Sequence, residues 1–87
     1  MDINVHVDPV SKVLQVEASI QNPIVNEKYV FAYYLYENGE RREVRWYQSQ
    51  PATVFKLDSV INRRSLRIVS FIRDSVGRVT RSSRSVF

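Results

Sequence analysis

Hydrophobic and polar residues alternate at every second position along most of this chain, which is the pattern of β-strands with one buried face. The segment 14–21 is the clearest case, because Leu14, Val16, Ala18 and Ile20 are each separated by a polar residue. No window of helical length carries an apolar stripe with the helical period of about 3.6 residues. The alternation predicts strands at about 3–7, 14–21, 29–37, 42–48, 53–57, 66–73 and 78–86.

Turn-forming residues separate these segments. Pro9 and Pro23 are predicted to end the first two strands, because proline donates no hydrogen bond to a sheet. Asn38-Gly39 predicts a two-residue hairpin turn of type I′, which needs positive φ at both central positions. Gly77 marks a second hairpin loop. Short strands joined in this way favour an all-β fold, specifically an immunoglobulin-like antiparallel β-sandwich of about seven strands.

Length and composition are those of one small globular domain. The 87 residues allow a single thin core, and the apolar share of 44% separates the chain from disordered sequences. We expect residues 1–87 to form one sandwich domain that is excised from a larger multidomain protein, because strand-like sequence begins at Ile3.

No apolar run approaches the roughly 18 residues of a membrane span, and no signal peptide is recognisable, so we expect no membrane insertion. The compartment stays open. The absence of cysteine excludes a disulfide framework and a thiolate metal site.

The net charge of +4 comes mainly from arginine, with ten arginines against three lysines. A basic chain attracts anionic partners, so arginines in the second half form a candidate anion-binding set. The alternative is that arginine is simply the solvated residue on alternating strands. The set comprises Arg63, Arg64, Arg67, Arg78, Arg81 and Arg84.

Residue types needed for catalysis are sparse. The single histidine, His6, cannot build a metal site alone, and no nucleophile motif accompanies it. Two glycines are too few for a glycine-rich phosphate loop. The carboxylates Glu37, Glu40 and Glu43 alternate with arginines, as on a solvated hairpin. We therefore expect no catalytic residues, no metal and no cofactor, and we interpret the chain as a non-enzyme.

The segments 29–37 and 66–73 differ from the others because both of their faces are apolar. If Phe31, Tyr33 and Leu35 point into the core, a second set projects outward. That outward set comprises Tyr34, Tyr36, Val69 and Phe71. The third and sixth strands are neighbours in an immunoglobulin-like sandwich, so this set is expected to lie side by side as a contact surface. Equally, tyrosines on a strand pack across their neighbours while their hydroxyl groups stay in water.

The return strand adds two further candidate binding residues. Alternation predicts Val44 and Trp46 on one of its faces, and Arg45 and Tyr47 on the other.

Two functions follow from these aromatics. In the first, the outward face docks another domain of the parent protein, a separate protein, or a second copy in a weak dimer. In the second, Tyr34, Tyr36, Trp46 or Tyr47 stack on sugar rings in a carbohydrate-binding module. Coplanar exposed rings would favour sugar, and a flat aliphatic-aromatic patch would favour docking. Nucleic acid is not expected, because no RRM, KH or zinc-finger pattern accompanies the arginines.

The run from Tyr33 to Glu40, followed by Arg45-Trp46-Tyr47 and by Phe71 to Gly77, resembles bacterial β-sandwich modules of the triple-tyrosine and fibronectin type III-like kind. The resemblance covers roughly residues 29–79. Where such domains carry Gly-x-Tyr at the start of the sixth strand, this chain has Arg64-Ser65-Leu66, so the tyrosine-corner hydrogen bond is not carried over. The resemblance implies an accessory domain of a larger bacterial protein, such as a sensor or a protein that handles surface carbohydrate.

Overall fold

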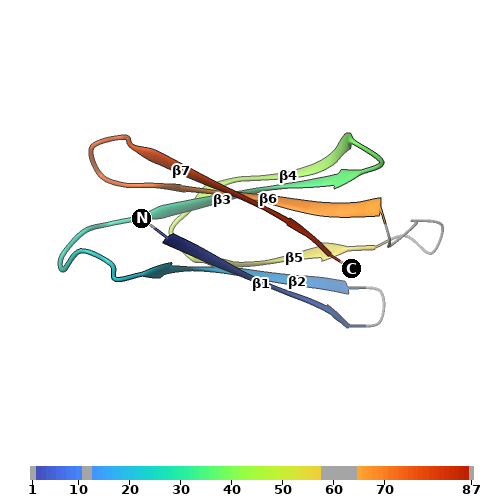
Figure 1. The fold of residues 1–87 in the computed structure, drawn as a ribbon, viewed down its shortest axis with the longest axis horizontal. Helices are drawn as coiled ribbons and strands as arrows, with labels where there is room; N and C mark the ends of the chain where they lie inside the picture. The colour runs from blue at the N-terminus through green and yellow to red at the C-terminus, as the bar shows by residue number, and fades with distance from the viewer. Residues whose placement is uncertain (1, 11–12, 58–64, 87) are drawn as a thin grey trace.

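Two antiparallel sheets face one another in the computed structural model, which describes residues 2–10, 13–57 and 65–86 (Figure 1). The strands follow the alternating segments of the sequence. The three-stranded sheet has the order β1-β2-β5 and is made of β1 (Asp2–Val10), β2 (Val13–Gln21) and β5 (Ala52–Lys56). The four-stranded sheet has the order β4-β3-β6-β7 and is made of β4 (Glu40–Gln48), β3 (Val30–Glu37), β6 (Leu66–Arg73) and β7 (Val79–Ser85). The predicted seven-strand antiparallel sandwich is confirmed.

The β3–β4 hairpin forms where the sequence predicts it. Asn38 and Gly39 have φ values of 50° and 81°, and Glu37 pairs directly with Glu40. Because the turn is this tight, β4 begins two residues earlier than the expected Arg42.

The prediction that Pro9 ends the first strand is wrong. β1 continues to Val10, and Pro9 pairs with Leu14 of β2. β1 is an edge strand with a single neighbour, and edge strands are where a sheet tolerates the missing N–H of proline. By contrast, β2 ends at Gln21, before Asn22 and Pro23, as predicted.

The core lies between the two sheets, and Phe31, Tyr33 and Leu35 point into it as predicted. The fully buried side chains that meet there include Leu14, Val16, Tyr33, Leu35, Phe55, Leu66, Ile68 and Ile72. The Tyr33 hydroxyl donates a hydrogen bond to the Pro51 carbonyl and accepts one from the Ala18 N–H at 3.1 Å. Burial raises the pKa of Tyr33 to about 12. This hydroxyl therefore connects β3 to β2 and to the β4–β5 connection.

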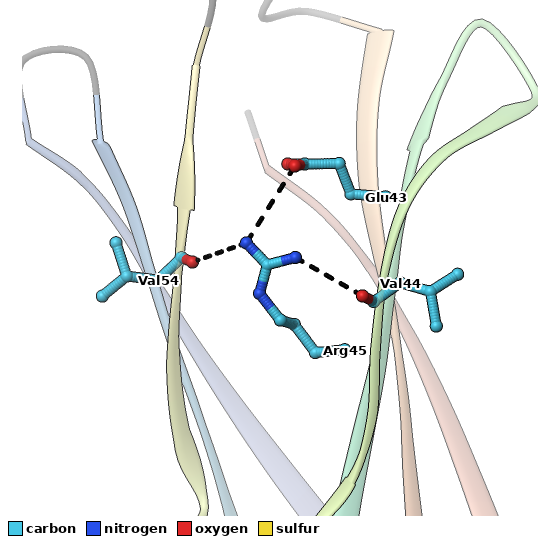
Figure 2. Close-up of polar contacts among 4 residues, drawn as sticks. All are labelled: Glu43, Val44, Arg45 and Val54. Atoms are coloured by element: carbon cyan, nitrogen blue, oxygen red, sulfur yellow. Dashed lines mark hydrogen bonds and ion pairs between the residues drawn. The ribbon is translucent and has the colours of Figure 1, made fainter.

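Arginine side chains join the two sheets at their open edges. Figure 2 shows Arg45 of β4 between the sheets, where Nη2 donates to the Val54 carbonyl of β5 at 3.1 Å and Nη1 contacts the Val44 carbonyl at 3.4 Å. Its guanidinium carbon lies 4.5 Å from the centroid of the Phe55 ring. At the other edge, Arg84 of β7 donates to the Val5 carbonyl of β1. Both arginines thus link strands of different sheets that share no backbone ladder.

Candidate functional site

Aromatic and aliphatic side chains gather on the side of the four-stranded sheet that faces away from the core, which we call the outer face. The strand register fixes their positions. Tyr34 of β3 lies between Val44 of β4 and Val69 of β6, and Val69 in turn pairs with Ser83 of β7. Tyr36 and Phe71 occupy the flanking outward positions, so the structure brings together the four residues that the sequence places outside the core.

These four residues form a second, smaller apolar cluster rather than a fully exposed patch. The Tyr34 ring centroid lies 4.9 Å from that of Phe71 and 6.3 Å from that of Tyr36. Val69 is only 3% exposed and Ala32 is fully buried, although both point outward. Their neighbours on the sheet must therefore cover them, and the rings of Tyr34, Tyr36 and Phe71 are half-buried.

A β-bulge sets the positions of Trp46 and Tyr47. Phe31 pairs with Gln48 and Tyr33 pairs with Arg45, so Trp46 and Tyr47 together oppose the single residue Ala32. Their ring centroids are 5.3 Å apart.

The expectation that Tyr47 lies on the same face as Arg45 is wrong, because the bulge interrupts the alternation and puts Tyr47 beside Trp46 on the outer face. Trp46 is 66% exposed and Val44 is 38% exposed. The exposed large apolar side chains of this face are therefore Trp46 and Val44 on β4, together with Val79 on β7, which is 52% exposed opposite Arg73.

Two arginines that the sequence analysis did not include among the site residues lie over the aromatic rings. The Arg41 guanidinium carbon is 5.1 Å from the Tyr34 ring centroid, and that of Arg73 is 4.3 Å from the Tyr47 ring centroid. Both distances are within the range of cation–π contacts. The pairing register places both arginines on the outer face, because Arg41 pairs with Tyr36 and Arg73 pairs with Val30 at outward positions. Knowledge of this register would have been needed to predict their role.

The candidate anion-binding arginines do not form one group. Arg63 and Arg64 lie outside the described residues. Arg84 connects the two sheets, and Arg78 lies in the β6–β7 loop. Arg67 and Arg81 remain together on the outer face.

Arg67 and Arg81 line a hollow of about 250 Å³ at the end of the outer face near the β3–β4 hairpin. Tyr36, Val69 and Ser83 complete its lining together with Gly39 and Ser65, and we call it the basic hollow. The Nη1 atom of Arg67 donates to Ser83 Oγ at 2.9 Å, which fixes one side of its guanidinium group.

Charge on the outer face has one sign. The outward strand positions carry Arg41, Arg67, Arg73 and Arg81 but no aspartate or glutamate. Within the described ranges the one ion pair, Arg45 with Glu43 at 4.0 Å, belongs to the open edge between the sheets. No carboxylate among the described residues therefore pairs with the four outer-face arginines.

Other parts of the described structure provide weaker candidates for a binding site. A wide, shallow hollow beside β1 and β7 is lined by Asn4, His6, Ser19 and Ser82 among others, and it holds no carboxylate. In the described part of the chain, no three histidine, aspartate or glutamate side chains are grouped to hold a metal ion. The same residues contain no helix that is long and apolar enough to cross a membrane.

Comparison with family models, with curated proteins and with solved structures found no significant match to this chain.

Proposed function

We propose that the chain is a non-catalytic accessory module of a multidomain bacterial protein, and that its outer face docks a neighbouring domain or a separate protein. The observation that carries this proposal is the exposed Trp46 and Val44 at the border of a basic, aromatic sheet face. Exposed apolar groups rimmed by polar residues are typical of interaction surfaces, and tryptophan, tyrosine and arginine are enriched where binding energy concentrates.

The ring geometry favours a protein over a sugar. The three ring pairs of this face are tilted by 60°, 62° and 76° to one another, so they offer no coplanar platform. Guanidinium groups already lie over Tyr34 and Tyr47. A carbohydrate-binding module remains the second candidate, because Trp46 alone presents a largely exposed ring.

The strand order supports the resemblance to fibronectin type III-like and triple-tyrosine modules. β3 and β6 are neighbours in the four-stranded sheet, and the aromatic run of the resemblance lies on β3 and β4. The accessory role that such modules have in larger bacterial proteins agrees with a domain whose distinctive feature is a contact surface.

A photo-crosslinking amino acid in place of Val44, introduced into the gene at its own locus, tests this function. We expect crosslinks to a protein surface, identified by mass spectrometry, and we expect Trp46→Ser to remove them. Trp46 is 66% exposed, so this substitution should leave the unfolding midpoint in urea nearly unchanged.

The matched control carries the crosslinker at Val54, which is 46% exposed on β5 of the other sheet. Equal crosslinking from positions 44 and 54 would contradict the docking function. On a glycan array, a glycan that binds the wild type and not Trp46→Ala would instead establish the carbohydrate-binding candidate.

A further inference from the structure

We propose that the basic hollow receives a carboxylate side chain of the docked protein, so that the surface recognised by this module is an acidic protein segment. The inference rests on the docking function proposed above and names the chemistry of its partner. It concerns Arg67 and Arg81, whereas the docking function depends on Trp46 and Val44.

Three strands build the hollow. Tyr36 comes from β3, Arg67 from β6 and Arg81 from β7, while the buried Val69 lies among the lining residues. At about 250 Å³ the hollow has space for an acidic side chain together with water, given roughly 30 Å³ for each water molecule.

The donors of the hollow suit a carboxylate. A guanidinium group has five N–H donors in a planar fork, and Arg67 uses Nη1 for Ser83 at 2.9 Å. That bond orients the group and uses one of its five N–H donors. Arginine binds carboxylates with two parallel hydrogen bonds, and the Tyr36 hydroxyl adds another polar group to the lining.

Charge complementarity also points to an acidic partner. Arg67 and Arg81 line one hollow, Arg41 and Arg73 share their face, and no acidic side chain occupies an outward position there. Like charges on one surface repel each other, and an approaching carboxylate relieves that repulsion.

A protein segment fits this face better than a sulfated or phosphorylated polymer. The exposed Trp46 and Val44 need an apolar surface opposite them, which such polymers lack. Nucleotide bases need open ring faces, but guanidinium groups lie over Tyr34 and Tyr47. An acidic protein segment with apolar side chains can bind the basic hollow with its carboxylates and contact Trp46 and Val44 with its apolar groups.

The test is an NMR titration of the 87-residue chain with a synthetic peptide of alternating glutamate and leucine. A peptide of the same length with glutamine in place of glutamate is the uncharged reference. We expect the acidic peptide to shift the amide signals of β6 and β7 around the basic hollow. In the double variant Arg67→Gln, Arg81→Gln its affinity should fall by about tenfold or more, because hydrogen bonds to charged groups are lost.

The control double variant Lys28→Gln, Arg78→Gln removes the same charge from the loops at the opposite end of β3 and β6. We expect its affinity to change by no more than about twofold, as for distant exposed charges. Equal losses in both double variants, or equal binding of the two peptides, would overturn the inference. Tighter binding of a heparin oligosaccharide or an oligothymidylate that also depends on Arg67 and Arg81 would overturn it in favour of that polymer.

The two proposals fail separately. Crosslinking from position 44 that needs Trp46 but not Arg67 or Arg81 would leave the docking function standing and remove the acidic partner. If crosslinking from position 44 does not exceed that from position 54, while the acidic peptide still binds in the basic hollow, docking through β4 is contradicted and the acidic ligand of the hollow stands.

Discussion

Tyr33 places a hydroxyl group in the core, where it bonds both the Pro51 carbonyl and the Ala18 N–H. Replacing it in Tyr33→Phe keeps the ring and removes both bonds. Among the described residues, the Pro51 carbonyl then keeps the Ala18 N–H as its donor, at 3.4 Å. We expect the free energy of unfolding in urea to fall by about 1–2 kcal/mol at neutral pH.

The same hydroxyl makes stability depend on alkaline pH. The unfolded chain ionises this tyrosine near its ordinary pKa of 10, whereas burial holds the folded pKa at about 12. Below pH 10 both states keep the proton and the full stability is present. Between pH 10 and 12 the unfolded state releases the proton first, so stability falls with rising pH.

At about 1.4 kcal/mol for each pKa unit, this decline approaches about 2–3 kcal/mol. Tyr33→Phe lacks that part of the decline, so urea unfolding across this range should give the wild type the steeper loss. Parallel curves for the two proteins would contradict the assignment.

Ser70 places a second hydroxyl group in the core. It is fully buried on β6, and its Oγ atom has no hydrogen-bond partner among the described residues. Removing such a hydroxyl relieves its desolvation cost and leaves a side chain of nearly the same shape. Ser70→Ala is therefore expected to raise the free energy of unfolding by about 1 kcal/mol. The exposed Ser85→Ala is the control, and a destabilised Ser70→Ala would show that the hydroxyl has a partner.

At the scale of elements, Arg45 closes the edge between β4 and β5. Its Nη2 bond to Val54 at 3.1 Å and its position over Phe55 hold the two sheets together there (Figure 2). Arg45→Met keeps an unbranched aliphatic stem but removes the guanidinium group that makes these contacts. We expect the free energy of unfolding in urea to fall by about 1–2 kcal/mol.

Glu43→Gln is the comparison for this edge. The Glu43 carboxylate is 4.0 Å from Arg45 and both side chains are about a third exposed, so their pairing is worth about 0–1 kcal/mol. An equal loss in the two variants would mean that the ion pair, rather than the contacts with β5, stabilises this edge.

Alternation was sufficient to predict the strands, because burial of one sheet face demands a period of two. It also placed Phe31, Tyr33 and Leu35 in the core. Alternation fails at a bulge, where an extra residue shifts the pattern, and that is why the side of Tyr47 was predicted wrongly. The bulge depends on pairing with β3, which no local pattern in β4 records.

In the four-stranded sheet, a side chain that points away from the core is not always exposed to solvent. Tyr34 and Val69 point away from the core as their spacing predicts, but Val69 is buried because side chains from neighbouring strands cover it. Cross-strand neighbours come from register, and the basic hollow likewise combines β3, β6 and β7. The residue types of the site could be predicted from the sequence, while their grouping required the sheet.

For the whole molecule, the net charge of +4 is unevenly placed, since four arginines and no acidic residue occupy the outward strand positions of the four-stranded sheet. A face-to-face dimer through this surface would bring these four arginines of one copy against the same four of the other. Repulsion between them opposes self-association, even though Trp46 and Val44 supply exposed apolar surface.

Salt separates these two effects. The screening length is about 30 Å at ~0.01 M salt and about 3 Å at ~1 M, so repulsion between two outer faces is strong at low salt and largely screened at high salt. Sedimentation velocity should therefore find the wild type monomeric at low salt, with any self-association confined to high salt and removed by Trp46→Ser. A dimer that is tighter at low salt would mean that the outer-face arginines bind acidic residues elsewhere on the second copy, and self-association would then replace the acidic protein segment as the partner of this face.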